Sequence, residues 1–389
     1  MRNSSAAAAA RGGSSEPAAL PRSFVAAPPD GVLFATIAIL ISIGLVMVFS
    51  ASSAQAYADH HDTAYYLKRQ ALWLLVGSIC SLVAYRIDYH KLRALAPYAF
   101  VLAVASLAAV LVPHVGISVN GARRWLGIGG FAVQPSEFAK LALVVYLAAA
   151  LSAQGERITS LVKGLIPMCF AAAIVALLVL KEPDMGTASI ILMTAFAIFF
   201  AAGARIEHLL LVLLATVPAA AAAILASPYK RARIFAFVNP WKDPENTGFH
   251  IVQSLFALGS GGIFGVGLGE SRAKFFYLPE QYTDFIFSIL GEELGLVGAV
   301  SVVALFVVFG YRAIRIAIAA PDRFGSLLAG GCTALILIQA FVNIGVVTSS
   351  WPVTGVPLPF ISFGGSSLVV CRVAVALILN VGCRRRVDL

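Results

Sequence analysis

Residues 275–287 read Phe275-Phe276-Tyr277-Leu278-Pro279-Glu280-Gln281-Tyr282-Thr283-Asp284-Phe285-Ile286-Phe287, a polar loop that runs into an apolar helix. Asp284 stands where water and hydrocarbon should meet, so its carboxylate can contact a lipid headgroup without entering the bilayer centre. One interpretation is structural: Thr283 caps the helix, and Asp284 lies in its first turn, where negative charge is favourable. The other is a general base at the interface, with a pKa tuned by burial and neighbouring cations. The two interpretations are compatible.

The composition is that of a membrane protein. The chain has 389 residues, of which 60% are apolar and 12% charged, whereas soluble proteins are about 45–50% apolar and about 25% charged. The net charge of +9 comes from basic residues scattered in short clusters between apolar runs. They form no continuous basic stripe, which argues against a nucleic-acid partner.

Ten apolar runs predict about ten transmembrane helices, because roughly 20 apolar residues cross a bilayer. The runs are 31–50, 70–84, 95–112, 137–152, 161–180, 187–203, 207–226, 285–310, 324–347 and 362–382. We expect an all-α polytopic membrane protein with its membrane domain at 30–383 and a large extracytoplasmic loop, 227–285, between the seventh and eighth helices. Segment 1–29, rich in Ala, Ser, Gly and Pro, is predicted to be a disordered cytoplasmic tail, and 384–389 a second tail.

Lysine and arginine are unevenly distributed between the two sides of this topology. With the N-terminus in the cytoplasm, the inside segments hold 15 of these residues and the short outside loops hold 5. Cytoplasmic loops carry the excess of positive charge in membrane proteins. Both termini are therefore expected in the cytoplasm, with loops 113–136 and 227–285 on the outer face.

Two segments are too rich in glycine or proline for ordinary helices. Segment 259–269 has six glycines, and segment 352–367 has three prolines within eight residues. Irregular backbone is tolerated at membrane depth only where protein or a wet cavity covers it. We expect both segments to re-enter the protein or the membrane surface.

Charged residues gather in the segments expected on the outer face. Glu137 and Lys140 are three apart at the start of the fourth helix, so they can form an ion pair on one helical face, and Ser136 is a candidate cap. Arg123 and Arg124 are adjacent, and planar guanidiniums suit bidentate binding of phosphate, although two basic residues in a loop are also typical of a solvated surface.

Further charges on this face are Asp184, Arg233 and Lys274. Together with the preceding set they would suit a cleft for an anionic headgroup such as a pyrophosphate. A divalent cation, Mg²⁺ or Mn²⁺, could accompany it, but no residue spacing defines a metal site.

Three charges fall inside apolar runs. Glu292 and Glu293 lie about two turns into the eighth helix, and Arg372 lies midway along the last. Intramembrane charges are costly and usually face the bundle interior, where they find partners. We predict that one of the glutamates pairs with Arg372.

These segments together resemble the SEDS family (shape, elongation, division and sporulation) of integral-membrane peptidoglycan polymerases, over about residues 31–383. The most specific blocks are Asn120-Gly121-Ala122-Arg123-Arg124-Trp125, Gln134-Pro135-Ser136-Glu137, the block from Tyr277 to Glu293, and Pro357-Leu358-Pro359-Phe360-Ile361-Ser362-Phe363-Gly364-Gly365-Ser366-Ser367.

Within the family, two segments look more like the FtsW-like division branch and its sporulation relatives: Gly265-Val266-Gly267-Leu268-Gly269 and Asn239-Pro240-Trp241. Segment 352–359 looks slightly more like the RodA-like elongation branch. Tyr282 departs from the family pattern, in which a histidine commonly precedes the Thr-Asp pair, and so does Ser349-Ser350-Trp351, where small and apolar residues are usual. These departures concern local headgroup contacts and partner choice.

The resemblance implies glycosyl transfer between lipid II molecules on the outer face of the bacterial cytoplasmic membrane. The 4-hydroxyl of an acceptor sugar would attack the donor's anomeric carbon with inversion and displace undecaprenyl pyrophosphate. Asp284 matches the family's essential loop aspartate and would be the base. Glu137 and Lys140 would organise the cleft, and Arg123 and Arg124 would bind the diphosphate.

The resemblance also implies partners, and two alternative functions remain to be compared with the enzyme. The expected partner is a class B penicillin-binding protein, a transpeptidase with one membrane helix, alongside other divisome or elongasome membrane proteins. A lipid II flippase would instead need charged residues lining a path through the membrane. A division scaffold would need no Asp284. Because acid and base residues are concentrated in the outer segments, the sequence favours the enzyme.

Overall fold

The computed structural model describes residues 28–119, 122–128 and 131–384. The predicted tail 1–29 lies outside the described residues except for its last two positions. The second predicted tail, 384–389, is described only at Arg384, and the Asn120-Gly121 pair also lies outside.

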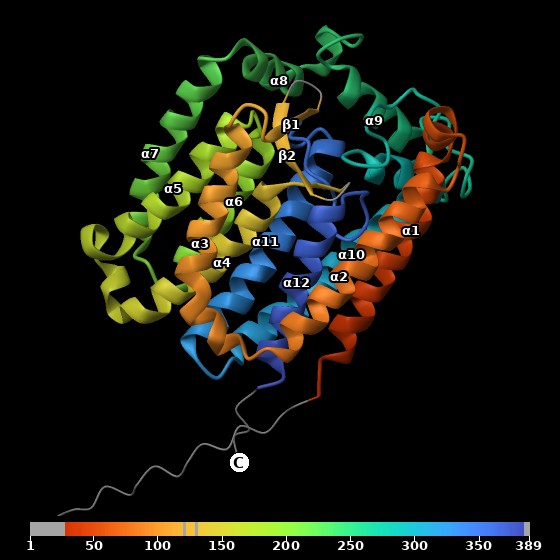
Figure 1. Ribbon diagram of the computed structural model, residues 1–389. Helices are drawn as coiled ribbons and strands as arrows, with labels where there is room; N and C mark the ends of the chain where they lie inside the picture. The colour runs from red at the N-terminus through yellow and green to blue at the C-terminus, as the bar shows by residue number, and fades with distance from the viewer. Residues whose placement is uncertain (1–27, 120–121, 129–130, 385–389) are drawn as a thin grey trace, which may run out of the picture.

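All ten expected apolar runs form helices in a single bundle, shown in Figure 1. Their bounds are α1 Gly31–His60, α2 Tyr65–Arg86, α3 Tyr89–Leu111, α4 Pro135–Gln154, α5 Ile166–Lys181, α6 Met185–Ala201, α7 Ile206–Leu225, α10 Ile286–Ile318, α11 Arg323–Val347 and α12 Gly365–Gly382. Among the described residues, eight helices are long and apolar enough to cross a membrane, if the π turn Leu161–Leu165 is counted with α5. Helix α6 and the apolar part of α7, Ile206–Pro218, are shorter. The chain is thus a multi-pass helical membrane protein.

The two long connections contain structure that the sequence did not predict. The first folds into a small antiparallel sheet in the order β1-β2-β3, with strands Gly116–Val119, Ala122–Ile128 and Phe131–Val133. The second contains α8 (Pro228–Val238), a 3-10 turn (Pro240–Lys242) and α9 (Phe249–Ser260). Both connections lie at the end of the bundle opposite the first turn of α1 (Figure 1).

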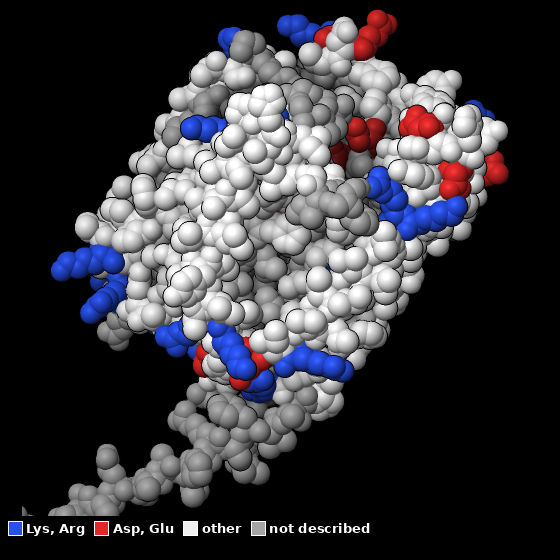
Figure 2. Space-filling view, viewed as in Figure 1, with Lys and Arg blue, Asp and Glu red and all other residues white. Residues whose placement is uncertain are grey.

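Polar contacts join the segments that charge bias placed on one side. Arg312, near the end of α10, donates to Asp30 before α1 with a shortest separation of 2.6 Å. Asp88, between α2 and α3, pairs with Arg384 beyond α12. The predicted grouping of these segments at one end is therefore confirmed. Figure 2 shows charged side chains at both ends of the visible face and an uncharged band between them.

Helix α10 is broken at Gly295, and the glycine-rich segment fills the break. Gly295 has φ 68° and ψ −167°, a left-handed conformation that favours glycine. The amides of Val266 and Gly267 donate to the carbonyls of Glu292 and Glu293 at 3.0 and 3.1 Å. On the other side of the break, Leu296 and Val297 donate their amides to the carbonyls of residues 262 and 263 at 2.9 and 3.2 Å. The loop thus replaces hydrogen bonds that an unbroken helix would make with itself.

The proline-rich segment is irregular backbone packed inside the bundle, as its punctuation predicted. Residues 352–364 form no helix, and Leu358, Phe360 and Ile361 are buried. Helix α1 touches this backbone directly at Gly44, where an added Cβ would lie 2.5 Å from the Phe360 carbonyl oxygen. The surrounding helices therefore cover backbone that would be costly to expose to lipid.

Candidate active site

Asp284 lies just before α10 and is not part of its first turn. The helix begins at Ile286, with Phe285 as the N-cap residue, and no side chain caps it. The Thr283 hydroxyl lies 2.8 Å from a carboxylate oxygen of Glu280 and 3.2 Å from the Glu280 carbonyl. The prediction that Thr283 caps this helix is therefore wrong, because its hydroxyl is used within the loop. The structural interpretation of Asp284 therefore loses the Thr283 cap, while Asp284 still lies next to the N-terminus of the helix.

The Asp284 carboxylate lies among charges of both signs. Its side chain is half-buried. Loss of hydration, followed by the negative charges of Glu280 and Asp184, raises the pKa of Asp284 to about 7, against the lowering effect of the Arg233 and Arg124 guanidiniums. The structure thus brings together residues from the first long connection, the start of α6, α8 and the start of α10.

The two arginines near Asp284 are held by backbone carbonyls. Arg124 donates from Nε to the Glu182 carbonyl at 2.9 Å and from a terminal nitrogen to the Pro183 carbonyl at 2.6 Å. Arg233 donates to the Val353 carbonyl at 3.2 Å. Arg123, which precedes Arg124 on strand β2, is exposed. Arg124 has no partner in the β1–β2 register, which shifts between Ile117 and Ser118, and its guanidinium lowers the pKa of Asp284.

Two further carboxyl groups lie at the start of α6. Asp184 caps that helix by accepting from the Thr187 amide and hydroxyl, both at 2.9 Å. Glu182 is 1% exposed, and neither of its carboxyl oxygens has a hydrogen-bond partner among the described residues. Burial, and then the charge of Asp184, raise the pKa of Glu182 to about 8, against the lowering effect of Arg124. This wall of the site therefore carries a carboxyl group that is largely protonated at neutral pH.

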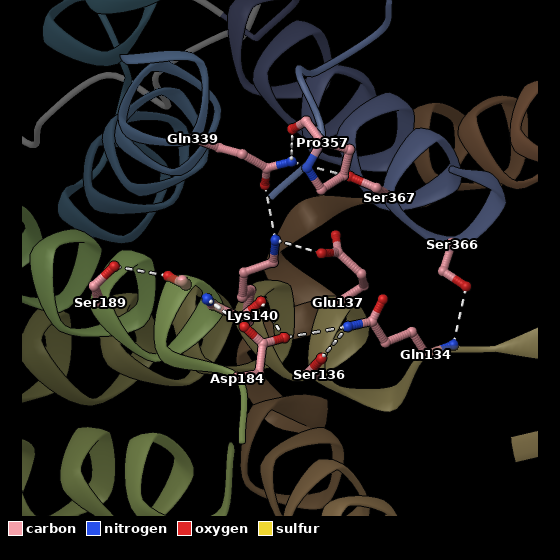
Figure 3. Close-up of polar contacts among 12 residues, drawn as sticks. Gln134, Ser136, Glu137, Lys140, Asp184, Ser189, Gln339, Pro357, Ser366 and Ser367 are labelled. Carbon is pink, nitrogen blue, oxygen red and sulfur yellow. Dashed lines mark hydrogen bonds and ion pairs between the residues drawn. The ribbon is translucent and has the colours of Figure 1, made fainter. Parts of the chain in front are cut away.

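Glu137 and Lys140 form the predicted ion pair, but deep in the bundle. Their side chains are 2% and 1% exposed, and Lys140 Nζ lies 2.7 Å from Glu137 Oε1. Lys140 also donates to Gln339 at 2.7 Å, and Gln339 donates to the Pro357 carbonyl and the Ser367 hydroxyl at 3.0 Å each (Figure 3). The pair therefore ties α4 to α11 and to the proline-rich segment.

The predicted Ser136 cap is wrong. Helix α4 begins at Pro135 with Gln134 as the N-cap residue, and no side-chain hydrogen bond caps it. Proline at the first helical position needs no hydrogen bond for an amide it lacks. Ser136 instead lies inside the first turn and accepts from the Gln134 side chain at 3.1 Å.

The intramembrane glutamates bind the loop that precedes them. Glu292 accepts from the Ser271 hydroxyl and from the Arg272 amide, the latter at 3.0 Å. Glu293 accepts from Ser50 of α1 at 2.6 Å and lies 3.4 Å from Lys274 Nζ. Lys274 is nearly fully buried in this pair.

The predicted pairing of a glutamate with Arg372 is wrong. Among the described residues, no ion pair joins Arg372 to either glutamate, and its Nε is buried without a hydrogen-bond partner. Its side chain instead packs along α2, where a Cβ added at Gly77 would lie 3.2 Å from the Arg372 Cδ. Lys274 reaches Glu293 because the loop that fills the break in α10 brings it there.

The sequence interpretation missed three groups that the structure places at the site. Glu280 acts on the pKa of Asp284, the Thr354 hydroxyl is buried without a partner among the described residues, and the Asn343 amide bonds to the Asp284 carbonyl. One signal was available. Gln339 and Asn343 are four apart in the apolar run of α11, a spacing that puts two costly amides on one buried face.

Known proteins resemble the chain over nearly its whole length. The sequence profile of the FtsW/RodA/SpoVE family, described as cell cycle proteins, matches residues 31–387. Stage V sporulation protein E of Bacillus subtilis is 44% identical over 353 residues, covering 91% of this chain and 96% of that protein. The probable peptidoglycan glycosyltransferase FtsW of Geobacter metallireducens is 43% identical over 357 residues, covering 92% and 95%.

A solved structure has the same fold. It is a chain of a peptidoglycan synthase complex, from work on the structural coordination of polymerization and crosslinking, and it is 30% identical with a TM-score of 0.76. The match covers 92% of this chain and 99% of that one. The profile, the identities and the shared fold agree with the motifs identified in the sequence, and the chain therefore belongs to the SEDS family of FtsW, RodA and SpoVE proteins.

Proposed function

We propose that this protein polymerises lipid II into glycan strands on the outer face of the bacterial cytoplasmic membrane, with Asp284 as general base. The observation that carries the proposal is the position of Asp284: a half-buried carboxylate just before a membrane helix that no side chain caps, within the electrostatic influence of Arg124 and Arg233. A general base works best when its pKa lies near the working pH. The pKa of Asp284, raised to about 7, meets that requirement.

In the proposed reaction, Asp284 is the base and two arginines stabilise the leaving group. Asp284 accepts the proton of the acceptor sugar's 4-hydroxyl as that oxygen bonds to the donor's anomeric carbon. The bond from that carbon to the undecaprenyl pyrophosphate breaks on the opposite side, which inverts the configuration. Negative charge develops on the departing diphosphate, where guanidiniums stabilise it in a site that excludes water. Arg124 and Arg233 are the cations placed for that role.

We also propose that a divalent cation accompanies the diphosphate. Among the described residues, no three His, Cys, Asp or Glu side chains come together as a metal site. Mg²⁺ commonly binds through one or two carboxylates together with substrate phosphates. Asp184, whose charge acts on Asp284, is the candidate carboxylate, and its two oxygens also accept from Thr187. The cation would offset diphosphate charge.

The biological setting follows from the relatives. Two of them are a sporulation protein and an FtsW, and the complex with the same fold joins polymerization with crosslinking. We propose that this protein works in division with a class B penicillin-binding protein as crosslinking partner. Both termini would be cytoplasmic, which puts the sheet, α8 and α9 outside.

The test is polymerisation of lipid II by the purified full-length protein with its cognate transpeptidase. Asp284→Asn should abolish glycan chains while leaving lipid II binding, since the amide cannot accept the proton. Glu245→Gln, an exposed carboxyl change in the same connection, should polymerise like the wild type. Equal glycan yield from Asp284→Asn would remove Asp284 as base. Lipid II flipping without polymer would support a transporter. The absence of both flipping and polymerisation would support a scaffold.

A further inference from the structure

Three successive carbonyls that end at Asp284 are each held from another part of the chain. The Phe363 amide donates to the Tyr282 carbonyl at 2.9 Å, and the Ser362 hydroxyl donates to the Thr283 carbonyl at 2.5 Å. Asn343 of α11 donates to the Asp284 carbonyl at 2.7 Å. The backbone entering α10 is therefore clamped in place over the residues that carry the carboxylate.

Asn343 joins the three elements of this clamp. Its side-chain nitrogen donates to the Val356 carbonyl as well as to that of Asp284, each at 2.7 Å. Val356 belongs to the proline-rich segment, and its neighbour Gly355 lies against the Asp284 carboxylate, where an added Cβ would be 3.4 Å from Oδ2. One amide thus fixes both the backbone of Asp284 and the backbone that its carboxylate faces.

The orientation of this amide is costly. Asn343 is 1% exposed, and both of its partners are carbonyls, which only accept, so the nitrogen must face them. The amide oxygen is left buried without a partner among the described residues. A buried acceptor without a partner lowers the stability of the folded state. An apolar side chain here would remove the unpaired oxygen but would leave the carbonyls of Asp284 and Val356 without their donor, so the amide is retained for those two hydrogen bonds.

We propose that Asn343 is a positioning residue that holds Asp284 in register with the acceptor hydroxyl. This inference rests on the proposed role of Asp284 as base. Errors of about 1 Å in the placement of a reacting group can lower a rate by roughly a hundredfold. Loss of the amide should therefore lower kcat, whereas the KM for lipid II, set by contacts with the whole headgroup and lipid, should change little.

The chain offers a matched control in Asn380 of α12. It is also a buried asparagine, 3% exposed, and its side-chain nitrogen donates to the carbonyls of Ala84, Tyr85 and Ile87 at 3.0, 2.8 and 2.5 Å. Those carbonyls surround the junction of α2 and α3, at the opposite end from Asp284. Asn380→Leu therefore removes the same chemistry from the bundle without touching the site.

The experiment compares Asn343→Leu with Asn380→Leu in the full-length protein with its transpeptidase. Thermal unfolding in detergent and lipid II polymerisation are measured for both. We expect similar losses of melting temperature, but a roughly hundredfold fall in kcat for Asn343→Leu alone. If Asn343→Leu does not fold, Asn343→Ala against Asn380→Ala gives the same comparison with a smaller side chain. Equal kcat in the two matched variants would overturn the proposal.

A second readout separates this inference from the proposed function. The carboxyl stretch of Asp284 is followed by infrared spectroscopy during a pH titration, and it is assigned by its loss in Asp284→Asn. Asn343→Leu should move the midpoint to lower pH, because a carboxylate no longer held in place gains hydration. An unchanged midpoint would count against Asn343. If the wild type forms no polymer but the midpoint moves, the positioning stands and the glycosyltransferase proposal fails.

Discussion

Lys140 and Glu137 form an ion pair of 2.7 Å whose side chains are 1% and 2% exposed. Removing one partner of a buried pair leaves an uncompensated charge, which costs about 3–5 kcal/mol. We predict that Lys140→Met markedly lowers the melting temperature of the purified protein. Lys68→Met is the control, because Lys68 and its partner Asp62 are exposed and surface pairs contribute only about 0–1 kcal/mol.

The double variant Glu137→Gln with Lys140→Met tests the same pair from the other side. It removes both charges, so a large part of the stability lost in Lys140→Met should return. If Lys140→Met melts like Lys68→Met, the pair does not hold α4 to α11.

The pH dependence of polymerisation should report the ionisation of Asp284. A general base is active when deprotonated, so kcat should fall about tenfold for each pH unit below the pKa of about 7 and level off above it. Glu280→Gln removes the carboxylate whose charge raises this pKa most, so the acid limb should move to lower pH. Arg233→Gln removes a guanidinium that lowers it, so the limb should move to higher pH.

Measurements of kcat from about pH 5 to 9 at saturating lipid II would check both shifts. Glu245→Gln, in the same connection but exposed, is the control and should leave the limb in place. Movement of the limb in the same direction in both variants would contradict the assignment to Asp284.

Arg372 is a half-buried cation whose Nε lacks a partner among the described residues. Replacing a poorly satisfied charge with an apolar side chain is often neutral or stabilising. We predict that Arg372→Leu leaves the melting temperature unchanged or raises it. Arg312→Leu is the contrasting variant and should lower it, because Asp30, whose side chain is 5% exposed, loses the Arg312 guanidinium. A lower melting temperature for Arg372→Leu than for Arg312→Leu would show that Arg372 is satisfied in the membrane.

The fold was accessible from the sequence because its main determinant is local. Each of the ten helices follows from an apolar run, and even the short run at 70–84 proved to be part of α2. Charge bias then grouped the loops correctly, since Asp30 meets Arg312 at one end. The sheet in the first connection was missed, because strands of three to seven residues in a polar loop leave little pattern.

The site was predicted less well, because its contacts join residues far apart in the sequence. Glu293 pairs with Lys274, and not with Arg372, because a loop packs into the break in α10. The periodicity of the sequence does not predict that break. The prediction of a Thr283 cap was wrong for a similar reason: the Thr283 hydroxyl donates to the carboxylate of Glu280. Asn343 was overlooked although an amide within an apolar run is itself a signal of a buried partner.

The break at Gly295 divides α10, the longest described helix, into two helical segments. Helix α10 has 33 residues, or about 50 Å at 1.5 Å per residue, whereas the hydrocarbon core is only about 30 Å thick. A continuous rod of that length would pass every tilt imposed by bilayer thickness directly to its upper end. The break at Gly295 interrupts such a rod, and the backbone on both sides of it hydrogen-bonds to the loop at residues 262–267. The part of α10 that follows Asp284 is therefore anchored to the large connection as well as to the rest of its own helix.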